Sequence, residues 1–172
     1  MPLTAEQFSK LYPKIIGWID LQLALHSNGA KPIAAAGFAR LPEYFGKDVL
    51  ASARYVLVDK VPMPPLTKLG LPQFADFEHM AAAGVTYRQT FFVRKEEAGR
   101  ESLFFHELIH VVQWSLLGPE NFLRQYAAGL ETAGYRNSPL EVMAYDAQER
   151  FEASHDTFDA VRLVKTQLRI TP

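Results

Sequence analysis

Two histidines and a glutamate lie close together in the segment His106-Glu107-Leu108-Ile109-His110, in the pattern H-E-x-x-H. The mostly apolar run from Glu101 to Leu117 around them predicts a helix. On a helix, side chains four positions apart lie on one face, so the two imidazoles can bind one metal ion. Glu107 follows the first histidine and is placed to act as a base toward a metal-bound water. The pattern therefore predicts a zinc site that performs hydrolysis.

A simpler interpretation makes His106 and His110 two core histidines with a glutamate between them. The neighbours of the motif are apolar on almost every side: Leu103, Phe104, Phe105, Leu108, Ile109, Val111, Val112 and Trp114. A helix that is apolar all round is buried, and burying imidazoles and a carboxylate without partners is costly. A metal ion gives these three polar residues a reason to be there, so we favour the metal site.

The composition limits which side chains can bind a metal and which partners the protein is expected to have. The chain of 172 residues has no cysteine, so a metal must be held by histidine and carboxylate side chains. The net charge of −1 predicts neither a nucleic-acid partner nor a membrane partner. We find no signal peptide and no apolar run long enough to span a membrane, so we expect a cytoplasmic protein. The oligomeric state stays open.

The elements that must position the motif follow from periodicity and from turn residues. A helix begins at the capping pattern Thr4–Gln7, is interrupted or restarted at Pro13 and ends at Asn28-Gly29. Further along the chain we expect a strand over 54–61, a loop over 62–72, a short helix over 74–83, a strand over 85–94 with a turn or bulge near Arg88-Gln89, the motif helix over 101–117, a break at Gly118-Pro119, a helix over 121–132, a loop over 134–138 and a long helix from Pro139 to Leu168.

This order predicts one α+β domain over residues 1–172, with a small mixed sheet packed on a helical bundle that contains the motif helix. Residues 1–84 supply the N-terminal helices and the first strand. Residues 85–172 supply a strand, the motif helix and a helix that brings a third ligand.

A third ligand is needed because a catalytic zinc has three protein ligands. No third histidine follows at close range, since position 116 is a leucine. Glu141 begins a helix after a loop, so it can be directed back toward the motif, and Glu149, two turns later, is its main rival. The other three histidines are expected at the surface or in packing contacts: His26, His79 and His155.

The segment HELIHVVQW, with Glu141 in an E-x-x-A context 31 residues after His110, resembles the gluzincin group of zincin metallopeptidases. It is also similar to small bacterial zincin-like proteins of unassigned function, and the likeness spans roughly residues 85–151. The resemblance implies a zincin-like fold, a Zn²⁺ ion held by His106, His110 and Glu141, and Glu107 as general base. The chain lacks the N-E-x-x-S-D signature of larger gluzincins and has little length left for a substrate-binding lobe.

We therefore expect a zinc-dependent hydrolase, most simply a metallopeptidase that acts on a peptide or protein. Tyr135, Arg136 and Tyr145 lie near the expected third ligand and could stabilise an oxyanion, although we slightly favour a packing role for each, with an amphipathic tyrosine whose ring is buried. The resemblance also implies that the strand Thr86–Arg94 is a sheet edge to which an extended peptide adds.

The alternative is a non-catalytic binding or toxin-like module that keeps the same fold around a structural metal. An open site with room for a substrate favours the enzyme, and a site covered by its own chain favours the module.

Overall fold

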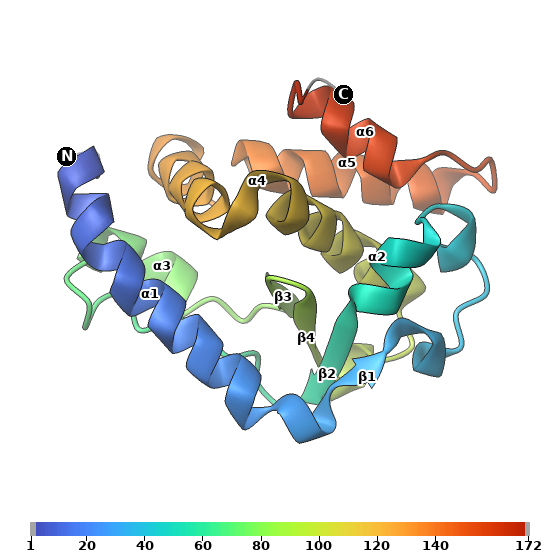
Figure 1. Ribbon diagram of the computed structural model, residues 1–172, viewed down its shortest axis with the longest axis horizontal. Coiled ribbons are helices and arrows are strands. Elements are labelled where there is room, and N and C mark those ends of the chain that lie inside the picture. Colours follow the sequence, from blue (N-terminus) through green and yellow to red (C-terminus); the bar gives the residue numbers. More distant parts are fainter. Residues whose placement is uncertain (1–2, 171–172) are drawn as a thin grey trace.

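Figure 1 shows a computed structural model of the protein, which describes residues 3–170. Within this range the chain forms six α-helices and a mixed sheet of four strands, which confirms the α+β class. In chain order the elements are α1 (Ala5–Leu25), β1 (Lys31–Pro32), α2 (Lys47–Ser52), β2 (Arg54–Val58), α3 (Ala75–Glu78), β3 (Gly84–Tyr87), β4 (Thr90–Arg94), α4 (Glu101–Ala133), α5 (Pro139–Ala153) and α6 (Ala160–Gln167).

The strands lie in the order β1-β2-β4-β3. Strands β2 and β4 are parallel, with Tyr55 opposite Phe91, whereas β3 and β4 form an antiparallel hairpin. Arg88 in the hairpin turn has a left-handed φ of 57°. The predicted strand over 85–94 is therefore two strands, because the turn or bulge expected near Arg88-Gln89 is a hairpin turn. Strand β4 is paired on both sides, and β3 lies at the edge of the sheet.

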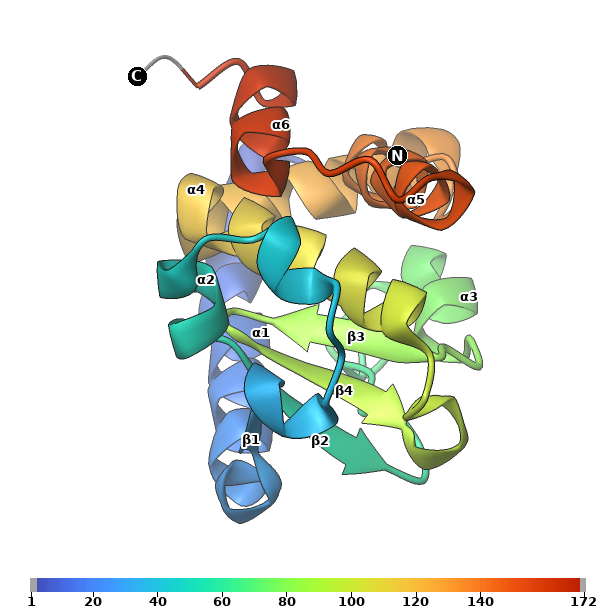
Figure 2. The same ribbon diagram turned by 90° about the vertical axis from the view of Figure 1, so that its right-hand side faces the viewer.

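The two faces of the sheet pack against different helices. On β4, the ring of Phe91 lies 5.3 Å from that of Phe104 on α4, and the adjacent Phe92 lies 5.1 Å from the ring of His26, which follows α1. Because neighbouring residues of a strand point to opposite faces, α4 covers one face and α1 the other. Helices α5 and α6 cover α4 on its side away from the sheet (Figure 2).

Helix boundaries confirm some predictions and correct others. The Thr4 capping box is present, but α1 continues through Pro13, which lies on an exposed side of the helix. The predicted break after the motif helix is a kink at Gly118, with φ 72°. The predicted single helix from Pro139 to Leu168 is wrong: α5 ends at Ala153, and the Asp159 carboxylate caps a separate α6. Strand β2 is also shorter than predicted and ends at Val58.

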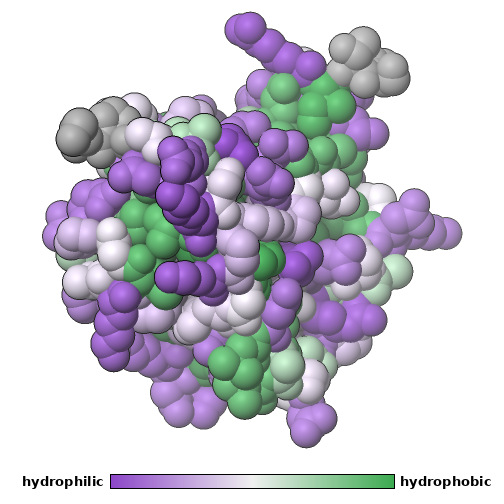
Figure 3. All heavy atoms as spheres, turned by 60° about the vertical axis from the view of Figure 1, so that its left-hand side comes forward, coloured by the Kyte–Doolittle hydropathy of each residue, from purple (hydrophilic) through white to green (hydrophobic). Residues whose placement is uncertain are grey.

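Two groups of buried apolar residues flank α4. Cluster I joins the sheet, the first turns of α4, α5 and α6, and its members include Tyr44, Tyr55, Phe91, Phe104, Phe105, Leu108, Phe151 and Val164. Cluster II joins α1, the 59–83 segment and the middle of α4, and its members include Ile15, Ile19, Leu71, Phe74, Tyr87, Phe92, Trp114 and Phe122. On the face drawn in Figure 3, apolar side chains form separate patches among polar ones.

None of the helices over residues 3–170 has the length and apolar character needed to cross a bilayer.

Candidate metal centre

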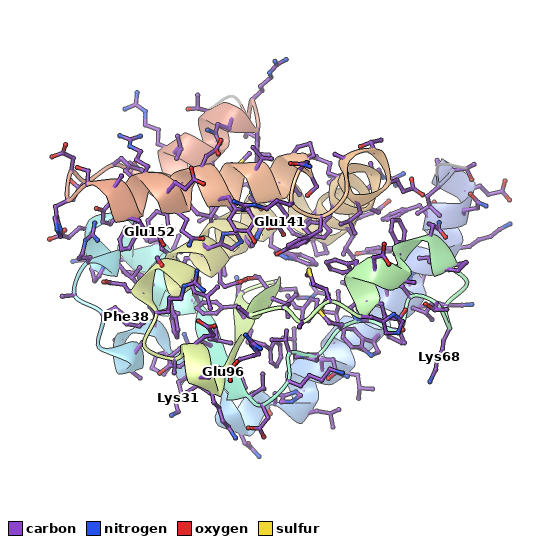
Figure 4. All side chains as sticks on the ribbon, turned by 180° about the vertical axis from the view of Figure 1, so that it is seen from behind. Lys31, Phe38, Lys68, Glu96, Glu141 and Glu152 are labelled. Carbon is purple, nitrogen blue, oxygen red and sulfur yellow. The ribbon has the colours of Figure 1, made fainter. Side chains whose placement is uncertain are left out.

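Three predicted ligands converge between α4 and α5. The Nε2 atoms of His106 and His110 are 3.1 Å apart. The Glu141 carboxylate lies 3.4 Å from each imidazole, with Oε2 toward His106 and Oε1 toward His110. Glu141 projects from the first turn of α5, the helix that runs beside α4 (Figure 4). All three side chains are buried, so the cluster could hold a metal ion inside the protein.

The approach of α5 to α4 depends on small and rigid residues. Ser138 and Pro139 start α5, and Pro139 suits a first helical turn because it has no N–H to lose. A Cβ atom at Gly129 of α4 would lie 2.8 Å from the Ser138 Cβ and 3.0 Å from the Pro139 Cδ. Glycine at position 129 therefore lets the start of α5 pack against α4, and this contact brings Glu141 to the histidines.

Gln113 fixes the His110 ring and links it to α5. Its amide nitrogen donates to the Leu140 carbonyl at 3.0 Å, which turns its Oε1 toward His110 Nδ1 at 2.8 Å. Since Oε1 can only accept, His110 Nδ1 carries the proton and Nε2 keeps the free lone pair in the neutral ring. Gln113 is fully buried and bonds to the residue just before Glu141. It therefore presents the nitrogen that a metal needs and holds two ligand-bearing helices together.

Tyr126, on the part of α4 beyond the kink, orients the third ligand. Its hydroxyl donates to Glu141 Oε1 at 2.6 Å. Burial, followed by the charge of Glu141, raises the pKa of Tyr126, so the phenol keeps its proton and remains a donor. This bond leaves Glu141 Oε2 as a buried oxygen without a hydrogen-bond partner.

The charges in the cluster favour a cation at its centre. Burial by itself lowers the pKa of His110, but Glu141 outweighs it and raises the pKa to about 9. Burial by itself raises the pKa of Glu141, but the two histidines outweigh it and hold that pKa well below its usual range. Glu141 Oε2 accepts no hydrogen bond, so a cation at this point would stabilise the buried oxygen. The donor set of two imidazoles and a carboxylate therefore fits a divalent metal ion.

Glu107 lies beside this centre and accepts a hydrogen bond from Thr86 on β3. The Thr86 hydroxyl donates to Glu107 Oε2 at 2.6 Å. Burial raises the pKa of Glu107, although His106 and His110 partly oppose this shift. A Cβ atom at Gly84 would lie 2.5 Å from Glu107 Oε1, so glycine at this point of β3 gives the carboxylate its space. The Glu107 carboxylate thus lies next to the three candidate ligands and is not part of that group.

The remaining predicted residues lie around the centre or outside it. The Tyr145 ring packs on His106 with centroids 4.5 Å apart, and the Arg136 guanidinium stacks on Tyr145 at 3.3 Å. Tyr135 lines a cavity that adjoins the centre. Glu149, the rival ligand, is exposed and lies 3.9 Å from Arg136. The other histidines lie away from the cluster: His79 and His155 are exposed, and His26 packs on Phe92.

Four residues of the centre were not predicted from the sequence. Gln113 carried a signal, since it is a polar residue three positions after His110 in an apolar helix. Tyr126, Thr86 and Gly84 carried none, because their roles depend on distances between elements.

Comparison of the chain with protein families, curated proteins and solved structures gave no match. The assignment of the centre therefore depends on the residues themselves and on their geometry.

Proposed function

We propose that the protein is a zinc-dependent hydrolase of the gluzincin type, most simply a peptidase, with Zn²⁺ held by His106, His110 and Glu141. The observation that carries this proposal is the spacing of the three ligands. Zn–N bonds of about 2.0–2.1 Å in a tetrahedral site place neighbouring donor atoms about 3.3–3.4 Å apart. The 3.1 Å between the two Nε2 atoms and the 3.4 Å from His106 Nε2 to Glu141 Oε2 are close to that spacing, and one donor atom of each of the three side chains lies within 4.8 Å of the others.

Zinc is favoured over other ions by the kind of donor. Magnesium and calcium prefer oxygen ligands, whereas imidazole suits zinc. Three protein ligands leave one position of a tetrahedron free, as catalytic zinc sites require. When bound, the ion supplies a Lewis acid that polarises a carbonyl group and lowers the pKa of water.

Glu107 is the residue that moves the proton. Its raised pKa brings the carboxyl group closer to the neutral range, where a group can both accept and return a proton. Thr86 holds one oxygen of Glu107, and Gly84 leaves space at the other. Glu107 accordingly takes a proton from the attacking water and delivers it to the leaving amine.

Strand β3 offers a place for an extended substrate, while β4 does not, because β4 is paired on both sides. In the register of the hairpin, the main-chain groups of Gly84 and Thr86 point away from β4. The Thr86 carbonyl already accepts from Trp114 Nε1 at 3.1 Å. A peptide that adds to this edge is therefore expected to bond to Gly84 and to the Thr86 N–H.

The burial of the centre favours a second candidate, a binding module with a structural metal. His106, Glu107, His110 and Glu141 are between 2% and 5% exposed. A metal so enclosed can serve to join α4 and α5, and the module then needs no hydrolysis. Both candidates bind the metal, and they differ only in whether Glu107 acts as a general base.

Metal analysis tests what both candidates share. Protein purified without chelator is expected to carry about one zinc ion per chain, as one such site implies. The double variant His106→Ala, His110→Ala should lose it, whereas the exposed pair His79→Ala, His155→Ala should keep it. Equal zinc content in the two double variants would exclude this site.

Cleavage of a peptide library separates the candidates. Glu107→Gln is expected to keep zinc and to lose about 100- to 10,000-fold in rate, the usual contribution of a general base. Loss of zinc from this variant would mean that Glu107 is a ligand. Zinc binding by the natural protein with no cleavage of any peptide would support the structural metal.

A further inference from the structure

A cavity of about 70 Å³ lies along β3, the edge strand of the sheet, beside the candidate metal centre. Glu107, His110 and Glu141 form its polar end. The whole strand Gly84–Tyr87 contributes to the lining, so the cavity reaches both faces of the edge: the one toward α4 and the one toward α1. A group bound at the centre therefore has apolar space directly beside it.

The walls away from this polar end are apolar or aromatic. They come from α1, the 59–83 segment and α4, and they include Ile15, Met63, Phe77, Met80 and Phe122. Among the described residues, no lysine, arginine or aspartate lines the cavity. Transfer of an unpaired charge into such surroundings is very costly, whereas an apolar group gains by leaving water.

The size of the cavity limits what it can take. An engineered cavity of about 150 Å³ holds benzene, so about 70 Å³ suits a short aliphatic group. A second apolar cavity of about 70 Å³ shares Ile15, Phe77, Leu123 and Tyr126 with the first.

We propose that this cavity is the subsite for an uncharged, aliphatic side chain or acyl chain carried by the carbonyl compound that the centre cleaves. This inference rests on the proposed function, because it takes the metal as the anchor of the substrate. The polar end binds the carbonyl group, and the apolar walls select what is attached to it. Substrates with an acidic or basic group at this position are excluded.

Binding of hydroxamates to the zinc-loaded protein tests the subsite by calorimetry. Acetohydroxamate reports on the metal alone, and pentanohydroxamate adds three carbons that must occupy the cavity. Each buried methylene contributes about four-fold in affinity, so pentanohydroxamate is expected to bind at least about ten-fold more tightly. Succinic monohydroxamate, of similar length with a carboxylate at its end, is expected to lose that gain.

The outcomes separate the two levels of the proposal. If no hydroxamate binds, the metal centre and the proposed function fail. If acetohydroxamate binds and pentanohydroxamate binds with the same affinity, the metal centre stands and the apolar subsite is wrong. The same conclusion follows if succinic monohydroxamate binds as tightly as pentanohydroxamate.

A filled cavity gives a second test. Met80→Trp places a larger side chain in the lining and should bring the affinity ratio of pentanohydroxamate to acetohydroxamate close to one. Leu25→Trp is the matched control, because Leu25 is 67% exposed on α1 and does not line the cavity. The Leu25→Trp variant should keep the affinity ratio of the natural protein. An unchanged ratio in Met80→Trp, with both variants folded by thermal melting, would overturn the inference.

Discussion

Cluster I and cluster II lie on opposite sides of the candidate metal centre and differ in how they are filled. Cluster I contains closely packed rings, such as those of Phe105 and Phe151 with centroids 4.5 Å apart. The cavity beside the metal centre takes most of its apolar lining from cluster II, including Trp114 and Phe122, and none from cluster I. Beside the centre, cluster I is therefore closely packed and cluster II leaves a cavity. A larger space of about 290 Å³ adjoins cluster I at Ile33 and Leu41, but none of the residues of the centre lines it.

This difference follows from the elements that form each side. Next to the centre, cluster I consists of residues of α4 and α5, such as Phe105, Leu108 and Phe151, where regular helical spacing lets side chains pack closely. Its more distant members, such as Ile33, Leu41 and Tyr44, come from the irregular segment before α2. Cluster II includes several residues of the 59–83 segment, in which the only helices are a 3-10 turn and the four-residue α3. A site that must hold ligands in place and also admit a substrate benefits from both kinds of packing.

Removal of one ring from each side tests the comparison most strongly. Phe151 is 2% exposed and contacts Tyr44 and Phe105, so Phe151→Ala is expected to lower the free energy of unfolding by about 3–5 kcal/mol. Phe77 of cluster II is half-buried beside existing space, so Phe77→Ala should cost less than half as much. Denaturant unfolding measures both.

The measurement must be made with a chelator present, because bound metal would add its own stabilisation. Equal losses in the two variants would contradict the idea that the sides are packed differently.

The contrast between local and distant contacts explains how much the sequence could predict. His106 and His110 are four residues apart on one helix, and Pro139 starts the helix of Glu141, so these placements depend on local rules. Gly84 and Tyr126 act across elements, at distances that only the packed protein sets.

The same contrast explains the errors. The sequence indicated a turn or a bulge near Arg88-Gln89, but the pattern alone did not show which of the two forms there, and the structure has a hairpin turn. The end of α5 at Ala153 and the cap at Asp159 lie in a polar stretch that is compatible with one continuous helix.

The contact between Gly84 and Glu107 gives the next largest effect. A methyl group in Gly84→Ala would lie 2.5 Å from Glu107 Oε1 and force the carboxylate to move. A misplacement of about 1 Å can cost about 100-fold in rate, and we expect a loss of that order in peptide cleavage with zinc content unchanged. Gly17→Ala, where a Cβ meets nothing within 4 Å, is the control. Full activity in Gly84→Ala would contradict the role of this edge.

The support of His110 by Gln113 predicts a smaller effect on metal affinity. Gln113→Leu removes the acceptor for His110 Nδ1 and the donor to the Leu140 carbonyl, so zinc should bind about 10- to 100-fold more weakly. Gln148→Leu is the matched control, since Gln148 is a buried glutamine of α5 that bonds to Glu152 away from the centre. Competition with a zinc chelator measures both variants. Equal affinities would show that Gln113 only fills space.

The smallest expected effect concerns the 59–83 segment on the cavity side. The Thr67 N–H and hydroxyl both donate to Glu78 Oε2 at 2.7 Å, and these bonds lower the pKa of Glu78 below its usual 4.5. A lowered carboxyl pKa gives stability that is complete above the usual value and is lost as the pH falls through the lowered one. Hydrogen exchange at the Thr67 amide, corrected for intrinsic rates, should therefore lose protection as the pH falls through the lowered pKa of Glu78. Glu78→Gln should remove this pH dependence, whereas Glu120→Gln, on the surface of α4, should retain it. Unchanged protection in Glu78→Gln would show that packing alone orders the segment.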